Sequence, residues 1–240
     1  MPRFFLQHID GQTAYIEGDD ARHIAKSLHA KPGRELVLCD MKGTDFLCKV
    51  REIDSSLVIL DILSSEPSRG EPRTYIKLYQ ALPKGEKFEF IVQKAVELGV
   101  SEIIPVLTSR CVSRPSYKAM EKKLVRFGRI AHEAAKQCGR GIVPPVRPLL
   151  EFQAAAAEMA GCDLPILFYE ESGAPLRSLL QASPGCISIM IGSEGGFSQS
   201  EVQLAAGLGV HTAGLGKRIL RCETAPIVAL SAILYQLGEF

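Results

Sequence analysis

The pattern of apolar and polar residues divides the chain near residue 70. Before this point, short apolar runs separated by turn residues predict strands at 35–40, 44–53 and 56–63. Ile24 and Leu28, four positions apart, predict one helix at 19–30. Several short strands with a single helix favour a small β-barrel, which we assign to residues 1–72.

After residue 73 the pattern changes to alternating strands and helices, which is typical of a parallel α/β sheet. A linker rich in Pro, Gly and Ser is predicted at 64–73. Strands are predicted at 74–82, 101–108, 164–170, 186–192 and 211–216, and helices at 86–98, at about 118–138, from Ser198 onward and at 225–237. Because knotted chains are rare, this pattern alone predicts an unknotted, doubly wound sheet over residues 73–240.

The last helix, 225–237, is apolar on all sides and therefore has to be covered on most of them. We predict a homodimer with this helix at its interface; a central core helix is the alternative. The uncharged run from Thr224 to Gly238 has 15 residues, fewer than the roughly 20 that span a membrane. The sequence therefore predicts no membrane partner.

Positive charge is concentrated in the middle of the chain. Residues 84–147 carry thirteen Lys and Arg against six Glu, whereas residues 1–72 carry nine against twelve acidic residues. This distribution favours attraction of a phosphate backbone to the middle segment. For 118–129 alone, a solvated helix face is an equal alternative.

The cysteines and histidines indicate neither a disulfide framework nor a metal site. Seven cysteines lie far apart without a C-x-x-C pair, and the five histidines show no ligand spacing. The amino terminus lacks the pattern of a signal peptide. We expect a cytoplasmic protein without a bound metal.

Two loops, GSEGGF (192–197) and KRILRC (217–222), each lie between a predicted strand and a predicted helix. Ser198 and Glu201 form a capping-box pattern after the first, and Thr224 is a candidate N-cap after the second. Such loops form a ligand cleft at the carboxyl ends of parallel strands. Neither loop fits a dinucleotide fingerprint or a P-loop.

Four motifs occur in order along the chain: KGEKFEFIVQKAVELGVSEIIPVLTSR (84–110), EAAKQCGRGIVPPV (133–146), IGSEGGFSQSE (191–201) and LGKRILRCETA (215–225). Together they resemble the RsmE family of 16S rRNA uridine-N3 methyltransferases, which belong to the SPOUT superfamily. The chain departs from the family at Ser193, where Pro is usual, and at His29, where Arg is usual. The resemblance implies a trefoil-knot methyltransferase domain over 73–240 and a PUA-like domain over 1–72.

The resemblance also implies S-adenosylmethionine as the cofactor, held by three loops. The residues implied in binding it are Leu167, Tyr169, Glu170, Ile191, Gly192, Glu194, Gly195, Gly196, Leu215, Gly216, Ile219, Leu220, Arg221, Thr224 and Ala225.

Methylation of N3 requires stabilisation of a negative uracil, and an arginine beside its carbonyl oxygens would supply this. Arg221 is the candidate, and a structural ion pair with Glu223 or Glu194 is the alternative. Glu194 would accept the N3 proton or order its loop, and the ordering role is favoured.

The RNA partner implied by the resemblance is 16S rRNA, free or in an assembled small ribosomal subunit. Gln137 and Arg140 are expected to approach the target nucleotide. The other expected RNA contacts are Arg3, Arg22, His23, Lys84, Lys87, Arg110, Arg114, Lys122 and Lys123.

Two other classes of protein remain open at this point. One is a non-catalytic rRNA-binding assembly factor, in which the glycine loops are structural. The other is a nucleotide-dependent oxidoreductase, against which the dinucleotide fingerprint is absent. Calorimetric titration with S-adenosylmethionine and with NADH would separate the three.

Overall fold

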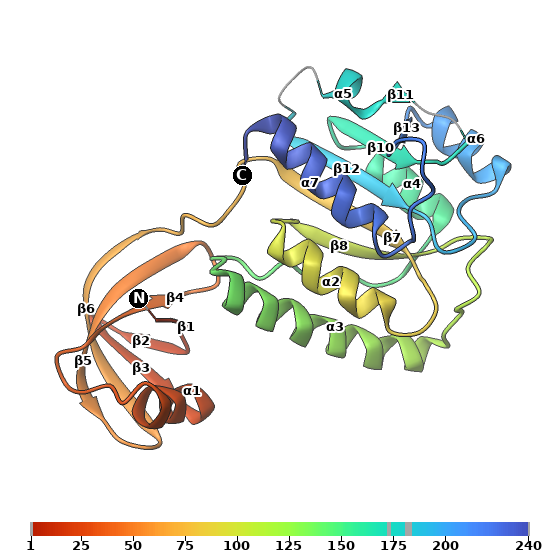
Figure 1. Cartoon of the computed structure of the whole chain (residues 1–240). Coiled ribbons are helices and arrows are strands. Elements are labelled where there is room, and N and C mark those ends of the chain that lie inside the picture. The colour runs from red at the N-terminus through yellow and green to blue at the C-terminus, as the bar shows by residue number, and fades with distance from the viewer. Residues whose placement is uncertain (1, 172–173, 181–183, 240) are drawn as a thin grey trace. The chain divides into compact units, whose positions relative to one another are not determined.

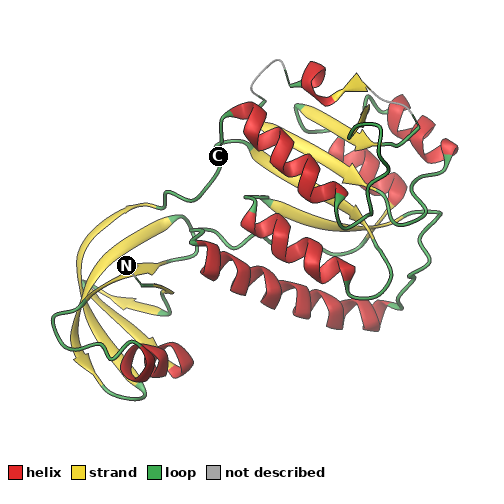
Figure 2. Cartoon of the chain, in the orientation of Figure 1, coloured by secondary structure: helices red, strands yellow, loops and turns green. Residues whose placement is uncertain are grey.

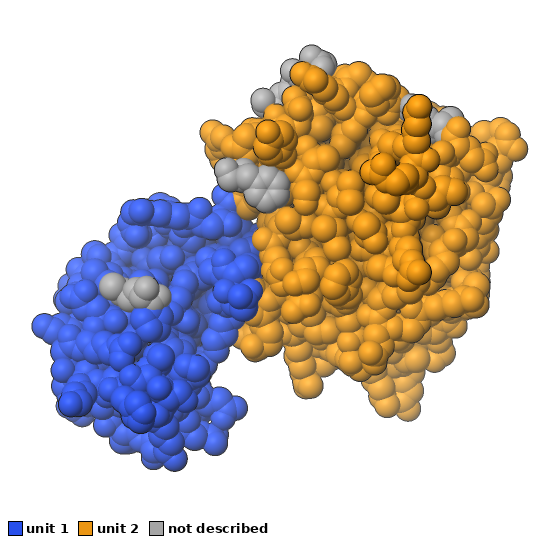
Figure 3. Space-filling model, viewed as in Figure 1, with its two compact units in different colours: residues 1–71, 135–143 blue, residues 72–134, 144–240 orange. Residues whose placement is uncertain are grey.

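The computed structural model describes residues 2–171, 174–180 and 184–239. The chain forms two compact units, coloured separately in Figure 3. Unit 1 comprises Met1–Glu71 with Ala135–Val143, and unit 2 comprises Pro72–Ala134 with Pro144–Phe240. The change of pattern near residue 70 therefore coincides with the end of the first stretch of unit 1. Its second stretch, 135–143, was not predicted from the sequence.

Unit 1 contains a curled six-stranded sheet in the order β1-β4-β5-β6-β3-β2 (Figure 1). Its strands are β1 (Arg3–Phe5), β2 (His8–Asp10), β3 (Thr13–Glu17), β4 (Glu35–Cys39), β5 (Thr44–Ile53) and β6 (Leu57–Pro67). Among the described strand pairs of this unit, β1 and β4 are parallel and the others are antiparallel. The helix α1 (Gly18–Arg22) continues into a π-helical turn, η1 (His23–Ser27).

The core of unit 1 is formed by every second side chain along its strands, because successive side chains point to opposite faces of the sheet. Ala14 and Ile16 point inward from β3, and Leu36 and Leu38 point inward from β4, all with no exposed surface. Ile24 packs against them from η1. The predicted strands at 35–40, 44–53 and 56–63 are confirmed. The predicted linker at 64–73 is wrong in its first part, because β6 continues to Pro67, which pairs with Thr44.

The segment 135–143 is fixed to unit 1 by a carboxylate. Glu71 accepts hydrogen bonds from the Arg140 guanidinium at 2.6 Å, from Gly141 N–H at 2.8 Å and from Ile142 N–H at 3.0 Å. Gly141 approaches unit 1 so closely that a Cβ there would lie 2.2 Å from Ser68 Oγ. A residue with a side chain would therefore force this contact apart.

Unit 2 contains a seven-stranded sheet in the order β11-β13-β10-β12-β7-β8-β9, with parallel pairing throughout the described strands. The strands are β7 (Tyr75–Ala81), β8 (Glu102–Leu107), β9 (Leu150–Glu151), β10 (Leu164–Phe168), β11 (Ala174–Pro175), β12 (Cys186–Ile191) and β13 (His211–Gly214). The helices are α2 (Lys87–Glu97), α3 (Tyr117–Cys138), α4 (Phe152–Met159), α5 (Leu176–Leu179), α6 (Gln199–Gly207) and α7 (Ala225–Leu237).

Helices cover both faces of this sheet (Figures 1 and 2). On one face α2 packs against α7, and on the other α4 packs against α6. Strand β10 is buried along its whole length, as its uninterrupted apolar run predicted. The long predicted strands and helices of unit 2 are confirmed. The short elements β9, α4, β11 and α5 were not predicted.

Cys162 and Cys186 form a disulfide, with their Cα atoms 5.2 Å apart. The cysteine spacing indicated no disulfide framework, and this single pair was not predicted from the sequence. The two residues are 24 positions apart in the chain, but Cys162 lies just before β10 and Cys186 begins the neighbouring strand β12. Sequence spacing does not reveal strand adjacency, which is what brings the two sulfur atoms together.

Candidate active site

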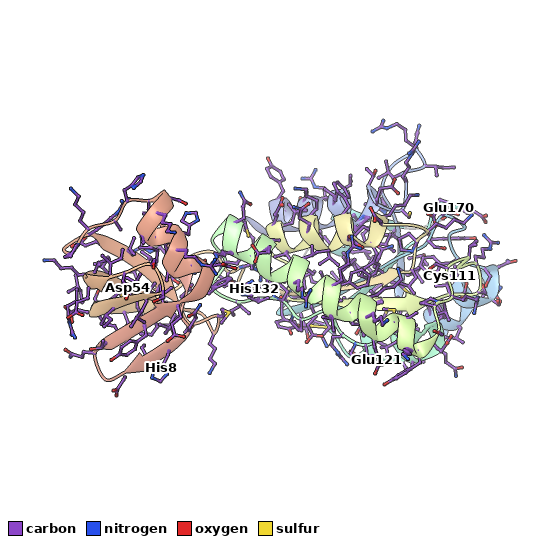
Figure 4. All side chains as sticks on the ribbon, turned by 90° about the horizontal axis from the view of Figure 1, so that it is seen from below. His8, Asp54, Cys111, Glu121, His132 and Glu170 are labelled. Atoms are coloured by element: carbon purple, nitrogen blue, oxygen red, sulfur yellow. A yellow bond between two sulfur atoms is a disulfide. The ribbon has the colours of Figure 1, made fainter. Side chains whose placement is uncertain are left out.

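A cavity of about 430 Å³ opens at the carboxyl ends of β10, β12 and β13. Its walls come from residues 168–170, 191–197 and 214–225, with Lys87 of α2 added. Glu170, labelled in Figure 4, lies two residues after Phe168, the last residue of β10. Three segments far apart in the sequence are thus brought to one edge of the sheet, as expected for a parallel α/β fold.

The structure brings together most of the residues expected to bind the cofactor. All of them line the cavity except Leu167, which is buried within β10, and Gly195 and Thr224. The lining also contains residues that the sequence did not single out as cofactor contacts: Lys87, Phe168, Ser193, Phe197, Gly214, Lys217, Arg218 and Cys222. Most of these residues lie inside the two glycine motifs. They could have been predicted as lining residues from their place in those motifs.

The first glycine loop is closely packed against its neighbours. Gly196 has a φ of 62°, and a Cβ there would lie 2.9 Å from Glu170 Oε1. A Cβ on Gly192 would lie 2.9 Å from Gly196 Cα. Only glycine fits both positions without displacement, so the loop presents bare backbone to the cavity.

A capping box joins this loop to helix α6. Ser198 Oγ accepts the N–H of Glu201, and the Glu201 carboxylate accepts the N–H of Ser198 at 2.8 Å. The same carboxylate accepts the N–H of Ser109 at 2.7 Å and its hydroxyl at 2.9 Å. The predicted helix start is confirmed, and it is tied to the loop that follows β8.

Glu194 is held by groups from α2 and from the turn before it. Its carboxylate accepts the Lys84 N–H at 3.2 Å and lies 2.9 Å from Lys87 Nζ. Burial alone would raise the pKa of Glu194, but these hydrogen bonds outweigh it and lower the pKa below its ordinary value. A carboxylate that is stabilised in its ionised form is a poor proton acceptor. The contacts favour the ordering role for Glu194.

Arg221 projects from the second loop into solvent, with 84% of its side chain exposed. Its nearest acidic partner is Glu223, with Nη1 4.0 Å from Oε1. An ion pair this long and exposed contributes little to stability. The geometry therefore leaves the Arg221 guanidinium free to meet a ligand at the cavity.

Cys222 is a buried residue of the second loop. Burial, followed by the neighbouring Glu223 carboxylate, raises the pKa of the Cys222 thiol to about 12. The thiol is consequently protonated at neutral pH and acts as a packing group rather than as a nucleophile.

Two buried polar atoms beside the cavity have no hydrogen-bond partner within the described residues. They are the Oγ of Ser193, whose residue is 7% exposed, and the Oε1 of Gln80, whose residue is fully buried. The amide Nε2 of Gln80 donates to the carbonyl oxygen of Gly192 at 3.3 Å. Ser193 lines the cavity, so a ligand there could satisfy its hydroxyl.

The residues of unit 2 expected to contact RNA lie in different environments. Lys84, Arg110, Arg114 and Lys122 are exposed, whereas Lys123 is half-buried. Arg110 donates to the Gly195 carbonyl at 3.0 Å, and Arg114 donates to that of Thr108 at 2.9 Å. Lys87 instead lies between Glu194 and Glu223.

The corresponding residues of unit 1 divide into exposed and internal groups. Arg22, His23 and Gln137 are exposed. The Arg140 side chain is only 5% exposed and is held by Glu71. Arg3 is paired with Asp45 at 2.6 Å and donates to the Arg140 carbonyl. The Arg140 guanidinium is thus buried against a carboxylate in this structure, and its approach to the target nucleotide stays a prediction.

Among the residues that the structure describes, no three His, Cys, Asp or Glu side chains gather as metal ligands. None of the described helices is both long and apolar enough to cross a membrane.

Comparison with known proteins relates both units to RNA methyltransferases. A family model described as an RNA methyltransferase domain matches residues 70–234, and one described as an RNA methyltransferase PUA domain matches residues 16–63. The fold and the matched domains thus define a two-domain protein of the RNA methyltransferase class.

Individual relatives narrow this class. Ribosomal RNA small subunit methyltransferase E of Bacillus subtilis is 33% identical over 98% of this chain and 97% of its own length. The same protein from Neisseria gonorrhoeae, in a crystal structure bound to S-adenosyl methionine, is 32% identical with a TM-score of 0.86, covering 98% and 97% of the two chains. A methyltransferase from Legionella pneumophila, in complex with the same cofactor, is 30% identical with a TM-score of 0.83. The chain belongs to the ribosomal RNA small subunit methyltransferase E family.

The resemblance carried by the four motifs is thereby confirmed, as is the fold class of an α/β methyltransferase domain with a PUA domain. The trefoil knot stays a prediction.

Proposed function

We propose that this protein transfers a methyl group from S-adenosylmethionine to N3 of a uridine in 16S rRNA. Membership of the family supports the reaction class. The observation that carries the proposal to this chain is the cavity of about 430 Å³, because it is formed by the two glycine motifs that are shared with the family.

The residues around the cavity fit this cofactor. Its volume lies within the range of small-molecule sites. Gly192 and Gly196 leave bare backbone against which a flat adenine can lie. The unpartnered hydroxyl of Ser193 can exchange a hydrogen bond with a polar group of the ligand. S-adenosylmethionine, when bound, supplies an electrophilic methyl group.

Arg221 is the residue that we place beside the uracil. Its exposed guanidinium can approach the carbonyl oxygens on either side of N3 and stabilise their negative charge. Glu194 keeps the first loop ordered through Lys84 and Lys87 rather than accepting the N3 proton. The chain's own contribution is thus positioning and electrostatic stabilisation.

The RNA partner is 16S rRNA, free or in an assembled small subunit, in the cytoplasm. Exposed cations on unit 2 suit phosphate contacts, with Lys84, Arg110, Arg114 and Lys122 as the candidates. Arg22, His23 and Gln137 are the exposed candidates on unit 1. The target base has to leave its stack to reach the cavity.

A second copy of the chain is the proposed partner of α7. This helix exposes Val228 and Tyr235, which are seven residues apart and therefore share a helix face. Their exposed fractions are 37% and 79%. The neighbouring helix α2 exposes Phe90 in the same unit. Apolar groups of this size on two packed helices favour a homodimer interface.

Incubation of the purified protein with S-adenosylmethionine and either 16S rRNA or small subunits tests the proposal. Nucleoside mass spectrometry should detect 3-methyluridine in one of the two substrates. Binding of RNA without methylation of either one, and without calorimetric binding of the cofactor, would instead support a non-catalytic assembly factor.

A further inference from the structure

We propose that Lys87 is a positioning residue that binds the two cavity loops to each other and so holds the cofactor site in its binding geometry. The two loops are the glycine loop (192–197) and the arginine loop (217–223). This inference rests on the proposed function, since it concerns affinity for S-adenosylmethionine. It assigns Lys87 a different task from the phosphate contact that its charge predicts.

The ammonium group of Lys87 lies between two carboxylates on different loops. Its Nζ is 2.9 Å from Glu194 Oε1 on the glycine loop and 3.3 Å from Glu223 Oε2 on the arginine loop. Lys87 is the first residue of α2, so a helix packed on the sheet fixes its backbone. One side chain of α2 therefore connects two loops that each lie more than a hundred residues later in the chain.

Neighbouring groups strengthen this arrangement. The backbone N–H of Lys84 donates to Glu194 Oε1 at 3.2 Å, and the Cys222 thiol donates to Glu223 Oε2 at 3.2 Å. The carboxylates are only 33% and 19% exposed. Each one is thus fixed by a second donor in addition to Lys87.

The protonation states favour the same arrangement at neutral pH. The hydrogen bond to Glu194 is the main cause that raises the pKa of Lys87. Burial would raise the pKa of Glu223, but its hydrogen bonds lower it overall, as they do for Glu194. The facing groups are the neutral Cys222 thiol and the exposed Arg221 guanidinium. Removal of Lys87 would leave two carboxylates facing each other, and their repulsion would separate the loops.

The position of Lys87 makes it a poor phosphate ligand. Its three N–H donors already face Glu194, Glu223 and the Cys222 sulfur, so a phosphate would have to displace one of these partners. Lys84, three residues earlier, contributes only its backbone to Glu194, so its exposed side chain is free for RNA. The two lysines of the KGEK motif therefore have separate tasks.

The loops need such a connection because glycine-rich segments lose much conformational entropy when they become ordered. Contacts that order a loop before the ligand arrives reduce this loss at binding and raise affinity. Lys87 would act in this way on both walls of the cavity. Its effect should appear mainly in the affinity for the cofactor.

A double-mutant cycle in the full chain tests the proposal. Lys87→Met and Glu223→Gln should each weaken S-adenosylmethionine binding on the order of tenfold in calorimetric titration, and the double variant should bind no more weakly than Lys87→Met. Lys87→Arg, which keeps the charge, should recover part of the affinity. In steady-state methylation, the KM for the cofactor should rise more than kcat falls.

Lys84→Met is the matched control. It removes a neighbouring ammonium but keeps the backbone donor to Glu194, so cofactor affinity should stay at the wild-type value. The salt dependence of rRNA binding separates the two tasks further, since it should become shallower in Lys84→Met and stay unchanged in Lys87→Met.

Additive losses in the cycle, or a shallower salt slope in Lys87→Met with normal cofactor affinity, would overturn the inference. Melting curves on each variant check that the fold is retained, and if Lys87→Met does not fold, Lys87→Arg and Glu223→Gln still test whether the ion pair supports cofactor affinity. A wild-type protein that fails to bind S-adenosylmethionine would contradict the proposed function itself, which is a different outcome.

Discussion

The carboxylate of Glu201 accepts hydrogen bonds from both the backbone N–H and the hydroxyl of Ser109, a residue 92 positions earlier. The same carboxylate caps helix α6. One nearly buried side chain thus joins the end of the glycine loop to the segment that follows β8.

Glu201 should make stability depend on acid pH. Burial would raise its pKa, but the hydrogen bonds lower it below the ordinary value of 4.5. Ionised Glu201 therefore stabilises the folded state above that value, and the contribution is lost as the pH falls through the lowered pKa. We expect Glu201→Gln to lower the free energy of unfolding by about 1–3 kcal/mol at pH 7.

Urea unfolding at several pH values measures this difference. The difference in the free energy of unfolding between the wild type and Glu201→Gln should become smaller below about pH 4.5. Glu121→Gln, at an exposed position of α3 (labelled in Figure 4), is the control and should change stability by less than about 0.5 kcal/mol. A gap that stays constant down to the acid transition would contradict the prediction.

Gly196→Val should abolish S-adenosylmethionine binding while the protein still unfolds cooperatively. The φ of 62° is unfavourable for a β-branched residue, and the added side chain would meet Glu170. Calorimetric titration measures the loss. Gly207→Ala, where a Cβ meets nothing within 4 Å at the end of α6, should bind normally. Wild-type affinity in Gly196→Val would show that the cofactor lies elsewhere.

Arg221→Ala should lower single-turnover methylation by about 100- to 1000-fold while rRNA and cofactor affinities stay within a few-fold of wild type. The exposed side chain and its long separation from Glu223 predict an almost unchanged melting temperature. Arg221→Lys should recover only part of the rate, because an ammonium lacks the planar fork of a guanidinium. Joint loss of cofactor binding and thermal stability would indicate a structural role instead.

Val228→Glu combined with Tyr235→Glu should give a folded monomer, because both residues are exposed on α7. Sedimentation velocity and a melting curve test this together. Leu230→Glu is the contrasting variant and should unfold the protein, since Leu230 has no exposed surface within unit 2. A wild-type protein that sediments as a monomer would rule out the homodimer.

Lys122→Glu with Lys123→Glu should weaken rRNA binding and flatten its dependence on salt. Each lost phosphate contact lowers the slope of log affinity against log salt by about 0.7 on single strands. Cofactor affinity should remain unchanged, since neither residue lines the cavity. An unaltered slope would mean that this face of α3 is only solvated.

The sequence predicts the elements with a strong pattern and misses those without one. Strands β10 and β12 are continuous apolar runs because they are buried on both faces, and they were predicted. Strands β1 and β2 have three residues each, too few for a period to be recognised.

The same distinction holds at the site. The glycine motifs predict which loops form the cavity, because strand–loop–helix order is local. The pairing of Lys87 with Glu223 and of Arg140 with Glu71 depends on tertiary contacts between distant segments. The charge of Lys87 and the family resemblance at Arg140 therefore suggested RNA contacts for two cations that are paired internally.

The return of residues 135–143 to unit 1 constrains how the protein is made. Glu71 is synthesised before α2, β8 and α3, yet three of its hydrogen-bond partners are Arg140, Gly141 and Ile142. The amino-terminal unit cannot complete its own contacts until more than half of the chain is translated. Its completion is consequently coupled to the synthesis of the catalytic half, and a fragment ending at residue 72 would expose the surface that Gly141 normally covers.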